Sequence, residues 1–131
     1  MKKLILITFI FLISCSGNDE PSIDPIIGKW KLHKLLAGGI DILNDCNRQN
    51  TLEFFENGEE ITEYHRYDNT GECIKYTDLG SWGESDEGDG WYCHGVCKKY
   101  VFSNNNNIMI NPGNPGHENP EDWDRIYIRI K

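Results

Sequence analysis

The stretch Thr51-Leu-Glu-Phe-Phe-Glu-Asn-Gly-Glu-Glu-Ile-Thr-Glu-Tyr-His-Arg-Tyr67 decides the fold. Two runs rich in aromatic and β-branched residues flank Asn57-Gly58. This dipeptide is the strongest short-range signal for a two-residue hairpin turn. With Asn57-Gly58 as the turn, Phe54 faces Ile61 on the same side of the sheet. The stretch therefore predicts an antiparallel hairpin.

Similar short segments, punctuated by glycine and asparagine, fill the chain on both sides of this hairpin. Seven or eight such strands joined by hairpins predict an antiparallel meander. Because an open meander leaves exposed edges, we expect an all-β, up-and-down barrel of about eight short strands, with a two-sheet β-sandwich as the alternative. The expected strands are 28–36, 51–56, 59–67, 72–82, one or two within 91–103, 108–110 and 123–131.

The last of these segments alternates cleanly. Ile126, Ile128 and Ile130 face one way. Tyr127 and Arg129 face the other. A period of two over this length predicts a half-buried strand.

The N-terminus has the character of a secretory signal. Lys2 and Lys3 precede an apolar run, 4–13, that is too short to span a bilayer, which takes about 20 apolar residues. Leu12-Ile13-Ser14-Cys15 resembles the lipobox of bacterial prolipoproteins, in which the cysteine is lipidated and the peptide is cut before it. We therefore expect a signal peptide over residues 1–14 and a lipid on Cys15.

The expected lipid anchor sets the rest of the organisation. Residues 15–25 form the lipidated cysteine and a polar, proline-bearing tether, and residues 26–131 form one domain. Asp19-Glu20 resembles the surface-export signals of Bacteroidetes lipoproteins, and a solvated linker is the alternative. The expected location is the cell envelope, at the outer membrane, with surface exposure if that signal acts.

Charge narrows the choice of partners. Without Lys2 and Lys3 the chain has 11 basic and 21 acidic residues, a net charge of −10. Nucleic-acid binding needs a basic footprint, so this balance argues against it. It also argues against electrostatic attachment to anionic lipid. The membrane link is therefore expected to come from the acyl chains alone.

A set of ordered motifs resembles a known family. Ile26-Ile27-Gly28-Lys29-Trp30-Lys31-Leu32 carries the Gly-x-Trp that opens the first strand of lipocalins. With the motifs that follow, the chain from 26 to about 82 resembles the short lipocalin-like domains of Bacteroidetes lipoproteins. The resemblance implies a β-barrel open at one end and a disulfide between Cys46 and Cys73. The further motifs are Asp45-Cys46, Phe54-Phe55-Glu56-Asn57-Gly58, Gly71-Glu72-Cys73 and Gly80-Ser81-Trp82.

The same resemblance assigns a structural contact. In lipocalins an arginine from the last strand covers the tryptophan of Gly-x-Trp. It implies that Arg125 or Arg129 covers Trp30, close to Gly28, in a cation–π contact. Arg125-Ile126-Tyr127 is also similar to the Arg-x-Tyr with which fatty-acid-binding proteins hold a carboxylate.

Four cysteines follow Cys15, and an even number in a small exported domain indicates disulfides. They are Cys46, Cys73, Cys93 and Cys97, which allow three pairings. A bridge from Cys46 to Cys73 would enclose the hairpin, and a three-residue loop would set Cys93 opposite Cys97. A catalytic dithiol remains the alternative for the first pair. Free thiols, or metal binding with His94, remain the alternatives for the second.

Residues 84–90, Glu-Ser-Asp-Glu-Gly-Asp-Gly, form an acidic, glycine-rich segment. Oxygen ligands at alternate positions suit calcium, but the full EF-hand spacing and its closing glutamate are missing. A solvated surface loop is the favoured interpretation. We expect no metal and no cofactor.

No nucleophile motif, phosphate loop or apolar carboxylate pair stands out in the sequence, so we expect no enzymatic activity. The thirteen aromatic residues after the signal suit a small filled core better than a ligand-lined barrel. The leading hypothesis is a lipid-anchored envelope lipoprotein whose barrel binds a small hydrophobic or amphipathic ligand. The alternative is a structural or interaction module that acts through surface loops on an envelope protein or a glycan.

Overall fold

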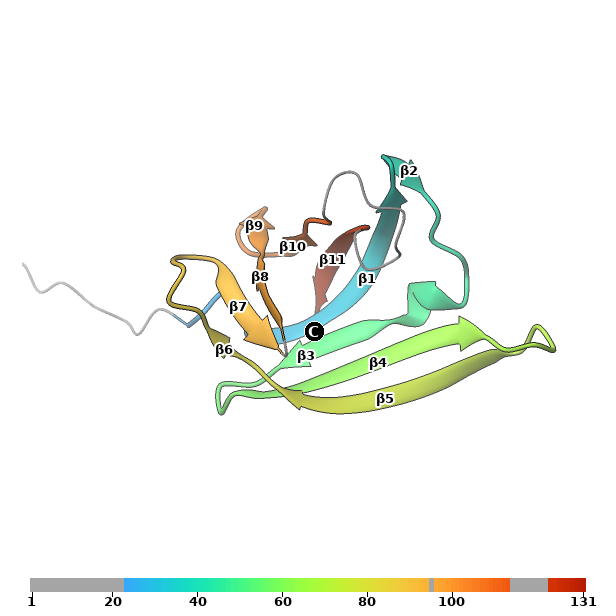
Figure 1. The fold of residues 1–131 in the computed structure, drawn as a ribbon, viewed down its shortest axis with the longest axis horizontal. Helices are drawn as coiled ribbons and strands as arrows, with labels where there is room; N and C mark the ends of the chain where they lie inside the picture. The colour runs from blue at the N-terminus through green and yellow to red at the C-terminus, as the bar shows by residue number, and fades with distance from the viewer. Residues whose placement is uncertain (1–22, 95, 114–122) are drawn as a thin grey trace, which may run out of the picture.

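A computed structural model describes residues 23–94, 96–113 and 123–131, and it is all-β with antiparallel pairing (Figure 1). The main sheet has the order β5-β4-β3-β1-β11-β10-β9, with β2 paired to β1, and a second sheet has the order β6-β7-β8. No helix in these ranges is long and apolar enough to cross a membrane. The elements are β1 Gly28–Ala37, β2 Ile40–Asp41, the 3-10 helix η1 Asn47–Gln49, β3 Thr51–Phe54, β4 Glu59–Tyr67, β5 Cys73–Ser81, β6 Gly83–Glu84, β7 Trp91–His94, β8 Val96–Lys99, β9 Val101–Ser103, β10 Ile108–Asn111 and β11 Asp124–Ile130.

The expected antiparallel all-β class is confirmed, whereas a closed barrel is not what the strands form. β5 and β9 end the main sheet, and within the described ranges they do not pair with each other. Figure 1 shows the sheet curling around a shared interior, with β6, β7 and β8 standing at one end of the curve. After β5 the chain leaves the main sheet, and it returns only at β9. With three residues, β9 is too short to close the sheet into a ring.

The β3–β4 hairpin forms as expected, but its register differs by one residue. Phe54 pairs with Glu60, not with Ile61, which pairs with Glu53. The turn takes three residues, because the Phe55 amide bonds to the Glu59 carbonyl and Gly58 adopts the left-handed φ of 82°. A slip of one residue exchanges the two faces of a strand. Glu60 therefore faces the interior.

The core lies on the inner face of the curved sheet. Trp30 and Leu32 of β1 are at most 3% exposed, and Phe54 of β3 and Met109 of β10 are at most 1% exposed. Tyr92 and Tyr100 close the core from the side of the small sheet. Full burial of a large apolar side chain stabilises by roughly 1.5–3 kcal/mol, so this cluster supplies most of the driving force for folding.

The strand β11 alternates as expected, and the structure shows which face turns inward. Tyr127 is 6% exposed and pairs with the core residue Leu32. Ile126, Ile128 and Ile130 lie on the outer face and are half-buried. The face that carries Tyr127 and Arg129 therefore points to the interior, and the isoleucine face does not.

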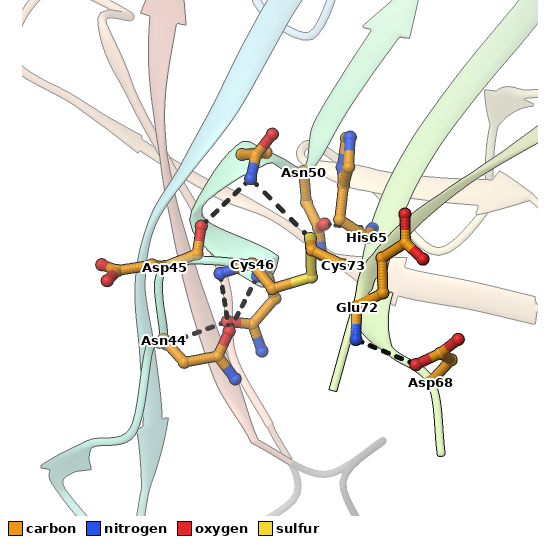
Figure 2. The surroundings of a disulfide bond; sticks show 10 residues. Asn44, Asp45, Cys46, Asn50, His65, Asp68, Glu72 and Cys73 are labelled. Carbon is orange, nitrogen blue, oxygen red and sulfur yellow. Dashed lines mark hydrogen bonds between the residues drawn. A yellow bond between two sulfur atoms is a disulfide. The ribbon is translucent and has the colours of Figure 1, made fainter. Parts of the chain in front are cut away.

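Two disulfides brace the described chain, and the first has the pairing that the family resemblance implies. Cys46 bonds to Cys73, with Cα atoms 5.5 Å apart, and joins the η1 segment to the start of β5 (Figure 2). Asn44 orders this segment, since its Oδ1 accepts the amide of Cys46 at 2.9 Å. Cys93 bonds to Cys97, with Cα atoms 3.9 Å apart, across the β7–β8 hairpin.

The two disulfides should differ in their effect on stability. Cys46 and Cys73 are 27 residues apart and Cys93 and Cys97 only 4. Loop-closure entropy then gives about 3–4 kcal/mol for the long loop and about 2 kcal/mol for the short one. We expect the double substitution of Cys46 and Cys73 by serine to lower the free energy of unfolding more than the same change at Cys93 and Cys97. Urea titration measures both, and equal losses would contradict this ranking.

Candidate ligand-binding face

One end of the curved sheet is sealed by a single arginine. The Arg129 guanidinium lies over the ring of Trp30, 4.2 Å from its centroid. It donates to the backbone carbonyls of Ile27 at 2.6 Å, Pro25 at 2.7 Å and Asn106 at 2.9 Å. Burial lowers the pKa of Arg129, yet a guanidinium stays charged at neutral pH. This contact joins the N-terminal segment, β1 and β11 at one point.

The glycine of the Gly-x-Trp motif makes room for that arginine. Gly28 has a φ of +124°, which side chains rarely adopt. A Cβ built at this position would lie 2.5 Å from the nearest guanidinium nitrogen of Arg129. Trp30 is fixed in turn, because its indole Nε1 donates to the Ile26 carbonyl at 2.7 Å. The packing of Arg129 over Trp30 therefore explains the Gly-x-Trp motif.

Replacement of Gly28 by alanine should be costly. A strained backbone conformation costs about 1–3 kcal/mol, and displacement of Arg129 adds to it. We expect Gly28→Ala to lower the free energy of unfolding by at least about 2 kcal/mol. Gly83→Ala is the matched control, since Gly83 has no positive φ and its Cβ would meet nothing within 4 Å. Thermal unfolding followed by circular dichroism compares the two, and equal stability would refute this role of Gly28.

The inner face of the sheet also carries polar side chains. Among the polar side chains that the strand register places on the same face as the core, we group five and call them the inner polar row. Glu60 pairs with Phe54, Thr62 with Leu52 and Arg125 with Leu35. Glu60 and Asn111 are only 6% and 7% exposed. The row consists of Glu60, Thr62, Asn111, Arg125 and Tyr127.

Members of the row interact with one another. Glu60 Oε1 accepts the Thr62 hydroxyl at 3.0 Å. Burial, with the negative charge of Glu60, raises the pKa of Tyr127 to about 12, against the opposing effect of Arg125. Burial also raises the pKa of the neighbouring Tyr100, again with Glu60 and Arg125 acting in opposite directions. The row thus brings a carboxylate, a guanidinium and a phenol close to one another inside the curved sheet, next to the phenol of Tyr100.

The Tyr127 hydroxyl makes stability depend on alkaline pH. In the unfolded chain a tyrosine ionises near pH 10, whereas in the folded chain Tyr127 holds its proton to about pH 12. The contribution of Tyr127 to the free energy of unfolding is therefore complete below pH 10. As pH rises to 12, about 2–3 kcal/mol of it is lost. We expect Tyr127→Phe to reduce the loss of stability over this range. Urea titrations at pH 10, 11 and 12 measure it, and an unchanged slope would contradict the burial of this phenol.

The segment expected to be a solvated acidic loop lines a surface pocket of about 450 Å³. Asp24 forms one wall and accepts the Tyr92 hydroxyl at 2.6 Å and the Ile26 amide at 3.0 Å. The hydrogen bond and negative charge of Asp24 raise the pKa of Glu84. The tether predicted from the sequence includes Asp24, and no local signal in the sequence marks the hydrogen bonds that this residue makes with the domain.

The structure separates the residues that the sequence singled out. Arg129, not Arg125, covers Trp30, while Arg125 lies on the inner polar row with Tyr127. The four cysteines are in disulfides. No group of three or more His, Cys, Asp or Glu side chains in the described ranges is arranged to hold a metal ion. Cys15 and the signal peptide lie outside the described residues.

Comparisons with protein-family models, with curated proteins and with solved structures found no match to this chain. The likeness to lipocalin-like domains therefore stays a prediction from the motifs. The candidate site depends on geometry alone.

Proposed function

We propose that this chain is a lipid-anchored envelope protein that binds a small amphipathic molecule on the inner face of its curved sheet, which we take to be an opened variant of a lipocalin-like barrel. The observation that carries the proposal is the inner polar row. It lies on the same face as the apolar core, with Glu60 and Thr62 opposite Phe54 and Leu52 and with Arg125 opposite Leu35.

The energetics favour a binding role for the row. Burial of a carboxylate or an amide costs free energy unless hydrogen bonds or an opposite charge compensate it. Apolar side chains at the same positions would stabilise so small a domain better. Buried ionisable groups gathered at one place are therefore candidates for recognition. Glu60, at 6% exposed, meets this description, and the buried amide of Asn111 lies on the same face.

The arrangement also suggests the chemistry of the ligand. Arg125 lies four residues from Arg129 along β11, about 13 Å at a rise near 3.3 Å per residue. The inner face thus provides apolar contacts from Trp30 and Leu32, and the row provides charged and hydroxyl groups on the same face. A molecule with an apolar body and a head that both donates and accepts hydrogen bonds fits this combination.

The expected anchor fits the same role. A lipid on Cys15 would hold the domain at the envelope without any basic surface, and amphipathic molecules are abundant there. The polar tether would leave the domain free to turn toward its ligand.

Native mass spectrometry of the full chain, purified from its membrane in mild detergent, tests the proposal. We expect a co-purifying small molecule, and we expect Glu60→Gln and Arg125→Gln each to weaken its rebinding about tenfold, which corresponds to 1.4 kcal/mol. Glu56→Gln and Arg48→Gln are the matched controls, because both residues are exposed and lie outside the row. Loss of binding in the controls alone, or no bound molecule, would refute the proposal.

A further inference from the structure

The outer edge of β5 is a long strand edge without a partner in the described ranges. β5 pairs with β4 over all nine residues without a bulge, and Figure 1 shows no strand of the described ranges on its other side. The Asp68 amide bonds to the Glu72 carbonyl, and the Trp82 amide bonds to the Gly58 carbonyl. These bonds fix the alternation, so the amides and carbonyls of Cys73, Lys75, Thr77, Leu79 and Ser81 point outward.

This edge lacks the devices that usually prevent strand addition. Such edges carry prolines, bulges or free lysines, or they are covered. β5 has no proline, and its one lysine, Lys75, is held by Glu63 of its own sheet. Leu79 is 79% exposed beside this edge. The edge is therefore suited to accept another strand.

We propose that a second copy of this chain pairs with β5 in antiparallel orientation, about a two-fold axis through Thr77. β5 runs from Cys73 to Ser81, so Thr77 is its central residue. The register centred there pairs all nine residues, and it brings the outward amides and carbonyls of each copy together. No other register uses the whole strand.

The side chains support the same register. Opposite residues on one face of an antiparallel pair have Cβ atoms about 4.5–5.5 Å apart. Tyr76 then lies opposite Asp78 of the second copy. The Arg66 guanidinium lies 4.6 Å from the ring centroid of Tyr76, which also stacks on Tyr64 at 5.1 Å. Arg66 is thereby placed to pair with Asp78 of the second copy, and the two-fold axis makes this contact twice.

Within one copy the same two charges cannot meet. Arg66 pairs with Ile74, whereas Asp78 pairs with Thr62. Four residues along β5 separate Ile74 from Asp78, which is about 13 Å. Neither Arg66 nor Asp78 has an ion-pair partner among the described residues. In the dimer, Arg66 of each copy would pair with Asp78 of the other.

The outer face of the joined sheet is complementary as well. In this register Leu79 lies opposite Lys75 of the second copy. The aliphatic stem of a lysine can cover apolar surface while its ammonium stays in water. The contact would cover Leu79, which is the most exposed large apolar side chain described. The net negative charge of each copy opposes association, so local complementarity must offset it.

A cysteine at the axis tests the pairing directly in the full, exported chain. In a hydrogen-bonded antiparallel pair, Cα atoms lie about 5.5 Å apart, within disulfide range. We expect Thr77→Cys to give a dimer linked through residue 77 in isolated envelopes treated with a mild oxidant, as read by non-reducing gels and mass spectrometry. Val101→Cys, on the opposite edge strand and 45% exposed, should give none. Equal crosslinking at both positions, or none at 77, overturns the proposal.

Two further variants test the register through sedimentation equilibrium of the full chain in detergent. Thr77→Pro removes an outward amide and should weaken dimerisation at least tenfold, with circular dichroism unchanged because edge strands tolerate proline there. Asp78→Arg should weaken it similarly, and Arg66→Asp added to Asp78→Arg should restore it. Glu56→Arg, with the same charge change at a distant exposed turn, is the control. Dimers unaffected by Thr77→Pro and Asp78→Arg overturn the proposal.

Discussion

The contact between Arg129 and Trp30 is the interaction on which the rest of this fold depends. The guanidinium stacks on the indole and donates hydrogen bonds to three backbone carbonyls. Those carbonyls belong to Pro25, Ile27 and Asn106, which lie between 23 and 104 residues from Arg129 in the sequence. One side chain therefore fastens the segment just before β1 and the turn before β10 to the last strand.

With that end sealed, the two faces of the sheet take different roles. The inner face is apolar around Trp30 and becomes polar toward Arg125, four residues along β11. The outer face carries the isoleucines of β11 and the ion pairs of Lys29 and Lys75. The polar side chains on this otherwise apolar inner face underlie the proposed ligand-binding role.

Much of the fold follows from sequence patterns, since strand rhythm and turn residues are local. The bounds of β4 and the alternation of β11 agree with the patterns. The register of the first hairpin does not, because Gly58 in a left-handed conformation lengthens the turn by one residue. That single residue decides whether Glu60 or Ile61 faces inward, so the key member of the inner polar row could not be found from the pattern.

Other features depend on contacts between distant segments. Either Arg125 or Arg129 could cover Trp30 by sequence, since both lie on the same face of one strand. Only the strand register of β1 with β11 distinguishes them. The open sheet is equally non-local, because closure depends on how the small β6–β8 sheet leaves and rejoins the main one.

Amide hydrogen exchange of the native protein tests most directly whether the Trp30–Arg129 contact holds the fold together. We expect the slowest amides to be those of Trp30 and Leu32 and of the flanking strands β3 and β11, which should exchange only through global unfolding. Faster exchange at these strands than in the small β6–β8 sheet would contradict it.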